Sequence, residues 1–436
     1  MSVIAPKFRL GYLIKGITDN IFWIIILVTL IAIPVIQIVL IYIDFPIIDG
    51  EIWNPFRVLD AMTHPERALP LVKSFMQTDL FKVVAFPGFG FAALIAAAVI
   101  FVERKMLAKL QLRVGPFYCG KVEGILQLMA DGLKLISKEI IIPAKADKPL
   151  FWAAPVLFAA TAAAFVALIP VAPGWVVADI DLGLLAVFAV IGFFPIITIL
   201  AGWSSNSKFP FIGGIRALFQ MVSFEIPLIL SLLGIVMLTG TLSLVEIVES
   251  QVNFPWIIFM PIGAIVFFIC ILAELERIPF DLPEAESEIV AGWLTEFSGM
   301  MYGLVQLGSY LKLYAFAALF VVLFLGGWNG PWFFPIEPMA EIITDGIVLM
   351  PDALVIKDIP GLPLFSQEMI NGTIWFVLKT VGVIFFILLP RGVFPRVRID
   401  LLLKIGWYKL IVLAFVNIFI ALALVYGGII GPGGIL

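Results

Sequence analysis

Hydrophobic runs of about 20 residues recur along the whole chain, and they constrain its fold more than any other feature. A helix rises about 1.5 Å per residue, so roughly 20 apolar residues cross the hydrocarbon layer of a bilayer. Of the 436 residues, 62% are hydrophobic and 13% are charged. A soluble domain carries about twice that charged share. The sequence therefore predicts an all-α polytopic membrane protein.

About nine stretches are candidate transmembrane helices. They are residues 21–43, 83–102, 151–172, 182–203, 217–240, 256–273, 297–326, 373–390 and 408–430. The first stretch is too long for the hydrophobic part of a signal peptide and has no small-residue cleavage site, so we expect it to be retained. The stretch 297–326 is long enough to tilt or to break.

The basic residues predict an orientation. With a cytoplasmic N-terminus, the segments on that side carry 20 of the 27 Lys and Arg residues, and the other side carries five. Such an excess is typical of cytoplasmic loops. The two long loops 44–82 and 328–372 then face the opposite side, where we expect them to be surface elaborations or contact sites for neighbouring proteins.

Composition argues against several classes of site. The net charge of −4 provides no basic surface for nucleic acid. Cys119 and Cys270 are far apart in sequence and form no CxxC motif, so neither a zinc site nor an iron–sulfur cluster is predicted. His64 is the one histidine, which cannot build a haem pair or a di-metal site. Electrons for any redox reaction must therefore come from a partner.

The segment 101–151 predicts a second kind of helix. Residues with no charge recur there at helical spacing: Ile125, Leu128, Met129, Gly132, Leu133 and Ile136. Charged residues occupy the other faces. This pattern is typical of an amphipathic helix lying along the cytoplasmic membrane interface. The lysines alone are equally consistent with simple anchoring by positive charge. The motif "RVGP" (113–116) predicts a turn, since Gly115 permits unusual backbone angles and Pro116 stops a helix.

Glu225 lies inside an apolar run, roughly 12 Å into its predicted span at a rise of 1.5 Å per residue. A carboxylate at that depth costs several kcal/mol unless it is protonated, paired or hydrated, so it is a candidate functional residue. The alternative is a neutral glutamate bonded to a neighbouring helix. Pro227 should loosen the helix nearby. Lys312 and Lys379 also fall within spans, and Lys312 could partner a buried acid.

The stretch "AELERIPFDLPEAESEIV" (273–290) concentrates acidic residues between two apolar segments. Pro279 and Pro283 exclude a continuous helix, so we expect a broken loop on the cytoplasmic side, followed by a helix. Crowded carboxylates repel one another, so some of their pKa values should rise and the group should titrate together. A proton relay needs this property, although a solvated acidic loop is the more usual outcome for a run of charges.

Six motifs, in order over about residues 83–430, resemble one known family. They read "ERKMLAKLQLRVGP", "LQLMADGLKLISKE", "GWSSNSKFPFIGGIRALFQMVSFEIP", "ERIPFDLPEAESEIVAGWLTEFSGM", "LFLGGWNGP" and "PRVRIDLLLKIGWYKL". The family is the quinone-chamber membrane subunit of respiratory complex I (NADH:quinone oxidoreductase), its H subunit, which adjoins the peripheral arm. The resemblance implies an eight-helix core over 83–430, with residues 1–82 as an extra N-terminal helix and outer loop.

The resemblance also implies roles for individual residues. Those matching the quinone chamber are Glu103, Arg104, Arg113, Ala130, Asp131 and Lys134. Those matching a proton-coupling chain toward antiporter-like subunits are Glu225, Arg277, Asp281, Glu284, Glu286, Glu288 and Glu296. Quinone would be a substrate, with no metal or covalent cofactor in this chain and iron–sulfur clusters in partner subunits. The setting would be an energy-transducing membrane, in the first place a prokaryotic cell membrane.

The sequence departs from the family pattern at two positions. Phe117 replaces the usual Asn after "GP", and Ser309 replaces a common Glu, so that relay position is lost or served by Lys312. Two alternatives therefore stay open. One is the corresponding subunit of a membrane-bound hydrogenase or ferredoxin-driven ion pump without quinone. The other is a stand-alone ion-coupled transporter.

Overall fold

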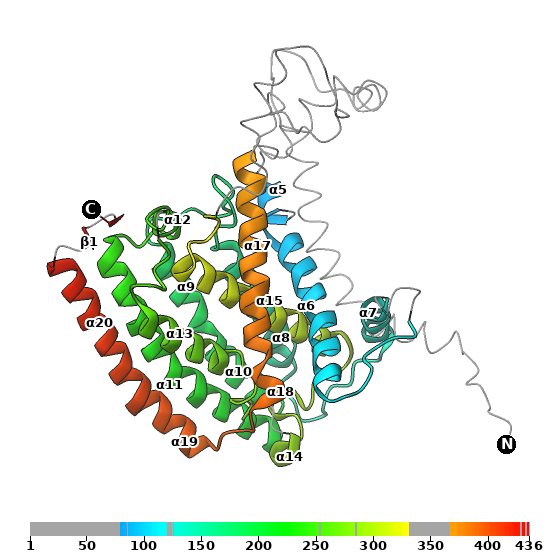
Figure 1. Ribbon diagram of the computed structural model, residues 1–436. Coiled ribbons are helices and arrows are strands. Elements are labelled where there is room, and N and C mark those ends of the chain that lie inside the picture. Colours follow the sequence, from blue (N-terminus) through cyan, green and yellow to red (C-terminus); the bar gives the residue numbers. More distant parts are fainter. Residues whose placement is uncertain are drawn as a thin grey trace, which may run out of the picture.

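The computed structural model describes residues 79–84, 86–119, 124, 126–252, 254–283, 286–330, 367–427, 430–431 and 434–435. Within these ranges the regular secondary structure is almost entirely helical (Figure 1), with seven helices long and apolar enough to cross a membrane. The exceptions are two antiparallel two-residue strands, β1 (Ile430–Gly431) and β2 (Gly434–Ile435). The prediction of an all-α polytopic membrane protein is confirmed.

The long helices account for most of the predicted spans. They are α6 (Phe89–Leu110), α8 (Lys148–Ala167), α9 with α10 (Gly183–Ile191 and Phe193–Ser204), α11 (Lys208–Thr239), α15 (Gly299–Phe324), α17 (Gln367–Leu388) and a continuous run of α19 (Ile399–Lys404), η4 (Ile405–Leu410) and α20 (Ile411–Tyr426). A shorter apolar helix, α13 (Pro261–Glu274), is the eighth.

Short helices connect or flank these spans. They are α5 (Asp79–Val84), α7 (Gln127–Ser137), α12 (Leu244–Glu249), α14 (Glu286–Ile289), η1 (Gly292–Leu294) and α18 (Pro390–Val393). The helix expected over the amphipathic pattern is thus present as α7. The candidate span 21–43 and most of the predicted loops 44–82 and 328–372, namely residues 44–78 and 331–366, lie outside the described residues.

Some boundaries differ from those predicted. The helix α11 begins at Lys208, well before residue 217, because its first turns pack on α10 through closely approaching backbone rather than through large apolar side chains. A Cβ on Gly214 would lie 3.1 Å from the Thr198 carbonyl oxygen. The helix α13 starts only at Pro261, since a proline fits the first turn of a helix. The long helix α15 is unbroken.

The helix α15 forms the centre of the bundle, where α6, α7, α8, α13 and α17 contact it. Most of its residues are buried, whereas few residues of the outer helix α20 are. On the far side, α11, α13 and α20 pack around the buried Asn417, whose Nδ2 donates to the Ser231 carbonyl at 3.0 Å. Gly234 and Gly263 leave the space that this side chain fills. Small residues around one polar side chain are a common way to join membrane helices.

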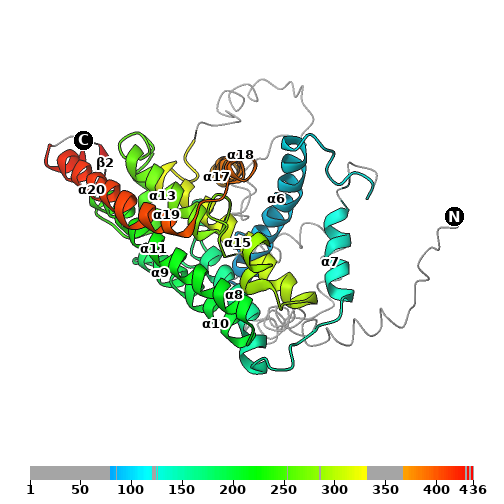
Figure 2. The same cartoon turned by 90° about the horizontal axis from the view of Figure 1, so that it is seen from below.

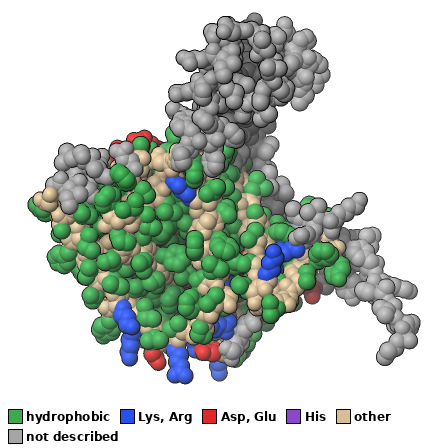
Figure 3. All heavy atoms as spheres, viewed as in Figure 1, with side chains coloured by type: hydrophobic (Ala, Val, Ile, Leu, Met, Phe, Trp, Pro, Cys, Tyr) green, Lys and Arg blue, Asp and Glu red, His purple; other side chains and the backbone are tan. Residues whose placement is uncertain are grey.

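The two ends of the bundle differ in charge. Figure 3 shows hydrophobic side chains over the visible face, with Lys and Arg side chains gathered at the end that carries α14, α18 and α19. This distribution agrees with the predicted grouping of the basic residues. The compartment that this end faces stays a prediction. The helices α6 and α7 stand to one side of the bundle, as the view from below shows (Figure 2).

Candidate functional site

An open pocket of about 770 Å³ lies between the end of α6 and the loop that follows it. The helix ends at Leu110, and the "RVGP" segment after it is not helical, as predicted. Gly115 lies close to α6, since a Cβ there would be 3.3 Å from the Lys105 side chain. The lining residues are Arg104, Leu107, Ala108, Arg113, Val114, Gly115, Pro116, Phe117, Tyr118, Cys119 and Gln127. The pocket therefore combines two guanidinium groups with apolar and aromatic walls.

An ion pair joins α6 to α7 beside this pocket. The Arg104 guanidinium donates to Asp131 Oδ2 at 2.5 Å, and Gln127 Nε2 donates to Asp131 Oδ1 at 3.1 Å. Burial alone would raise the pKa of Asp131, but the hydrogen bonds from Arg104 and Gln127 and the charges of Arg104 and Lys134 hold it below its ordinary value. Ala130 and Lys134 lie on exposed parts of α7 and do not line the pocket.

Glu103 points away from the pocket, although it precedes Arg104 in the same helix. Its side chain is buried, with 2% exposed. Arg277 and Arg391 both donate to its Oε1 atom, and the Tyr310 hydroxyl donates to Oε2 at 2.9 Å. The Arg277 guanidinium also lies 5.1 Å from the Tyr310 ring centroid. One carboxylate thus connects α6, α15, α18 and the loop after α13.

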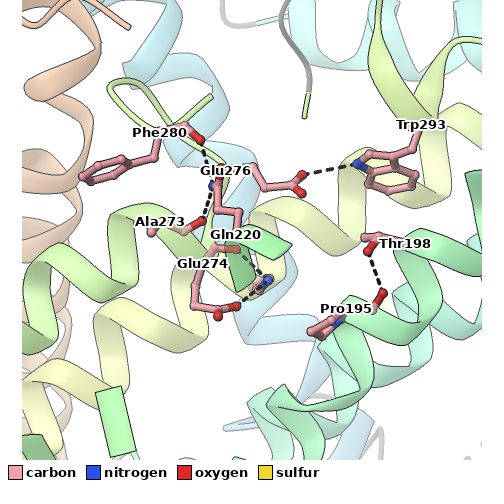
Figure 4. A network of polar contacts seen from close by, with 9 residues as sticks. Pro195, Thr198, Gln220, Ala273, Glu274, Glu276, Phe280 and Trp293 are labelled. Carbon is pink, nitrogen blue, oxygen red and sulfur yellow. Dashed lines mark hydrogen bonds and ion pairs between the residues drawn. The ribbon is translucent and has the colours of Figure 1, made fainter. Parts of the chain in front are cut away.

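The acidic loop begins where α13 ends at Glu274 and is non-helical through Pro283, which confirms the predicted break. Gln220 of α11 holds this loop, with Nε2 donating to the carbonyls of Ala273 and Phe280 at 2.7 and 2.8 Å. The Trp293 indole donates to Glu276 Oε2 at 3.3 Å (Figure 4). The helix expected after Pro283 is only the four residues of α14.

A second buried cluster lies among α11, α13 and α15. Lys312 of α15 donates from Nζ to the Glu274 carbonyl at 2.7 Å and lies 3.4 Å from Glu274 Oε2. Both side chains are almost fully buried, which confirms that Lys312 partners a buried acid. Lys379 instead donates to three carbonyls in the segment that follows α15, those of Leu325, Gly327 and Asn329.

Glu225 is half-buried in the middle of α11. Its Oε1 atom packs against the junction of α9 and α10, where a Cβ on Gly192 would lie 3.3 Å away. The charge of Lys312 acts on Glu225 as well as on Glu274. Pro227 leaves α11 unbroken, and Gly406 of η4 lies against the Ser223 carbonyl that the proline frees. The loosening expected at Pro227 stays a prediction.

The remaining acids of the stretch lie nearer the surface. Asp281 accepts from Arg396 at 3.0 Å, and Glu288 accepts from Arg216 at 2.5 Å. Glu296 is half-buried. Glu284 and the side chain of Glu286 lie outside the described residues.

Replacing Asp281 by Asn is expected to stabilise the protein at alkaline pH. Burial raises the pKa of Asp281 above its usual value, and the opposing charges of Arg396, Arg391 and Arg277 do not cancel this effect. A carboxyl with a raised folded pKa contributes stability below its unfolded pKa and loses it as the pH rises through the folded value. We therefore expect Asp281→Asn to raise the unfolding temperature by about 2 °C near pH 8, with less difference near pH 4.

The check is a thermal unfolding series across pH on the purified complex. Asp400→Asn is a matched control, since Asp400 lies at the start of α19 on the exposed surface. A lower unfolding temperature for Asp281→Asn near pH 8 would mean that the ion pair with Arg396 outweighs the cost of burial.

The structure brings together residues that the motifs had divided into two sets. Glu103, assigned to the quinone chamber, binds Arg277, assigned to proton coupling. Sequence reasoning missed Tyr310 and Arg391 as partners of Glu103, and it counted Arg391 only as a basic residue near the membrane. Glu274 and Glu276 belonged to the recognised acidic stretch, but nothing in the sequence distinguished them from its exposed members.

Comparisons with known proteins decide the family. The chain matches the family described as NADH dehydrogenase over residues 83–422. The H subunit of the NADH-quinone oxidoreductase of Bacillus cytotoxicus is 42% identical over 339 residues, which cover 76% of this chain and 92% of that protein. Its counterpart in Bacillus thuringiensis is 40% identical over 357 residues, covering 80% and 97%. The chain belongs to the family of NADH-quinone oxidoreductase H subunits.

As a member of this family, the chain is an integral membrane component of complex I, an enzyme complex of the translocase class. It therefore works with the other subunits of that complex. Among the residues that the structure describes, no group of three or more His, Cys, Asp or Glu side chains is placed to hold a metal ion. The family assignment favours complex I over the hydrogenase and stand-alone transporter alternatives.

Proposed function

We propose that this chain forms part of the quinone-binding chamber of its complex and couples quinone reduction to proton translocation through its buried carboxylates. One observation carries the proposal. The adjacent residues Glu103 and Arg104 face different sides of α6, so that Arg104 lines the pocket while Glu103 enters the buried network. A change of charge in the pocket beside Arg104 is therefore close to Glu103, the neighbouring residue, whose side chain lies in the bundle interior.

The chemistry of the pocket suits a quinone. Its aromatic and aliphatic walls, which include Phe117, Tyr118 and Leu107, match an apolar ring. Arg104 and Arg113 can donate to carbonyl oxygens, and their positive charge stabilises the negative charge that develops on those oxygens during reduction. Phe117, which replaces the family's usual Asn, adds an apolar surface where a hydrogen-bonding amide would otherwise lie.

The network from the pocket provides a route for coupling. From Glu103 it passes to Tyr310, and two residues further along α15 it meets Lys312 and Glu274. Glu225 follows on α11. Apart from the step along α15, each step changes helix, so a charge shift near the pocket acts electrostatically on groups deep in the bundle, where low polarity strengthens such effects. From Glu225 the route would continue to the antiporter-like subunits.

The other functions of the complex fall to partners. Electrons would reach the pocket from iron–sulfur clusters in peripheral-arm subunits that dock on the end of the bundle carrying Arg216, Arg391 and Arg396. We infer that this end is cytoplasmic, since it gathers the basic residues. Small membrane subunits and lipids would cover the exposed apolar faces of α11 and α20.

Photolabelling of the intact complex tests the site. A photoreactive quinone analogue should label residues 104–119 or α7, and an excess of unlabelled quinone should suppress the label. Arg113→Gln should reduce labelling, whereas Arg398→Gln, an exposed change outside the pocket, should not. Labelling confined to other subunits or to the lipid-facing helices would contradict the proposal.

A further inference from the structure

Lys312 is the one lysine whose side chain the described residues bury almost completely, with 3% of it exposed. Such a charge inside a membrane bundle is expensive unless it is paired, and it marks a functional residue by default. The ammonium lies 4.3 Å from the Phe194 ring centroid and 5.7 Å from that of Phe316. These two rings and the Glu274 carbonyl hold it in place, whatever the state of the nearby carboxylates.

The contact with the Glu274 carboxylate is loose by comparison. Nζ lies 3.4 Å from Oε2 but 2.7 Å from the backbone carbonyl of the same residue. The other carboxylate atom, Oε1, is buried and has no hydrogen-bond partner. Buried polar atoms normally have hydrogen-bond partners, so an ion pair that leaves one carboxylate oxygen without a partner differs from a purely structural one. Glu274 therefore has a free acceptor for a proton.

One cation faces two acids at this place. Lys312 acts electrostatically on Glu274 of α13 and on Glu225 of α11, and these two carboxylates also act on each other. A single positive charge balances one carboxylate, so the second is most stable when protonated. The position one turn earlier on α15 is Ser309, whose hydroxyl is bonded to the Val305 carbonyl, so it adds no charge.

We propose that Lys312 is a positioning residue of the coupling route, holding one negative charge that Glu274 and Glu225 share. When a proton binds one carboxylate, forming its O–H bond, the O–H bond of the other breaks and that proton moves on. Lys312 keeps its three protons throughout. This inference rests on the proposed function, since it names the residue that sets the charge of that route.

The experiment uses the complete complex in proteoliposomes, with two readouts: protons translocated per quinone reduced, and the infrared band of protonated carboxyl groups. Lys312→Met should lower the proton translocation rate about tenfold. It should also add one protonated carboxyl group to the infrared spectrum at the same pH. A second substitution, Glu274→Gln or Glu225→Gln, should remove that added signal. Lys312→Arg should restore part of the translocation. A purely structural lysine would change the yield of the complex without changing either readout.

If the complex with Lys312→Met does not assemble, the double variant Glu274→Gln, Lys312→Met is used instead, because it removes both charges of the ion pair. It should assemble and still translocate poorly. Normal translocation by either variant would overturn the role of Lys312. If Glu225→Gln nevertheless lost translocation, the proposed function would stand. Normal translocation by Glu225→Gln as well would instead contradict the proposed function.

Discussion

Replacing Glu103 by Gln is expected to destabilise the protein by about 3 kcal/mol and to abolish assembly of an active complex. The carboxylate is the shared acceptor of Arg277 and Arg391, and it also binds Tyr310. A neutral amide would leave two guanidinium groups close together with no anion between them. Removing one partner of a buried ion pair is more damaging than removing both, because the remaining charge stays desolvated.

Arg391→Gln is the matched control for this prediction. Arg391 is 39% exposed, and Arg277 would still balance Glu103 after its removal. We expect a loss of under about 1 kcal/mol, as for a partly exposed ion pair. Thermal unfolding of the purified complexes and their yields compare the two variants. Equal effects of the two substitutions would show that Glu103 does not act as the shared acceptor.

Gly213→Ala is expected to destabilise the protein by about 2 kcal/mol, through overpacking that side-chain movement cannot relieve. Gly213 lies in α11 directly against η1, and a Cβ there would be 2.6 Å from the Trp293 backbone nitrogen. Because the obstacle is backbone, η1 must move as a unit. That movement would also pull the Trp293 indole from Glu276.

Gly382→Ala in α17 provides the control, since a Cβ at that position would meet nothing within 4 Å. It should not lower the unfolding temperature, since replacing a helical glycine by alanine where there is room is neutral to slightly stabilising. Should Gly213→Ala behave like Gly382→Ala, the close packing of η1 on α11 would be wrong, and with it the placement of Glu276.

The spans were predictable because hydrophobic length is a local property of the sequence. Every predicted span within the described residues corresponds to a helix, and the two prolines correctly excluded a continuous helix through the acidic stretch. Boundaries were less predictable. The helix α11 starts at Lys208 because two glycines allow close backbone approach, a tertiary effect that hydropathy does not register.

The partners of the buried charges were not predictable from sequence. Glu103 and Arg277 are separated by 174 positions, and Glu103 and Arg391 by 288. Motif resemblance named Glu103 and Arg277 separately, but only the packing of α6 against α15 and α18 brings them together. For the same reason Glu274, which is buried against Lys312, could not be told apart from Glu288, which lies on the surface.

The most direct test of the coupling route is the number of protons translocated per quinone reduced by the reconstituted complex, comparing wild type with Glu225→Gln. Glu249→Gln is the control, because Glu249 is an exposed acid at the end of α12. We expect Glu225→Gln to reduce quinone while translocating fewer protons, and Glu249→Gln to match wild type. An unchanged ratio and rate in Glu225→Gln would contradict a role for the buried carboxylates in coupling.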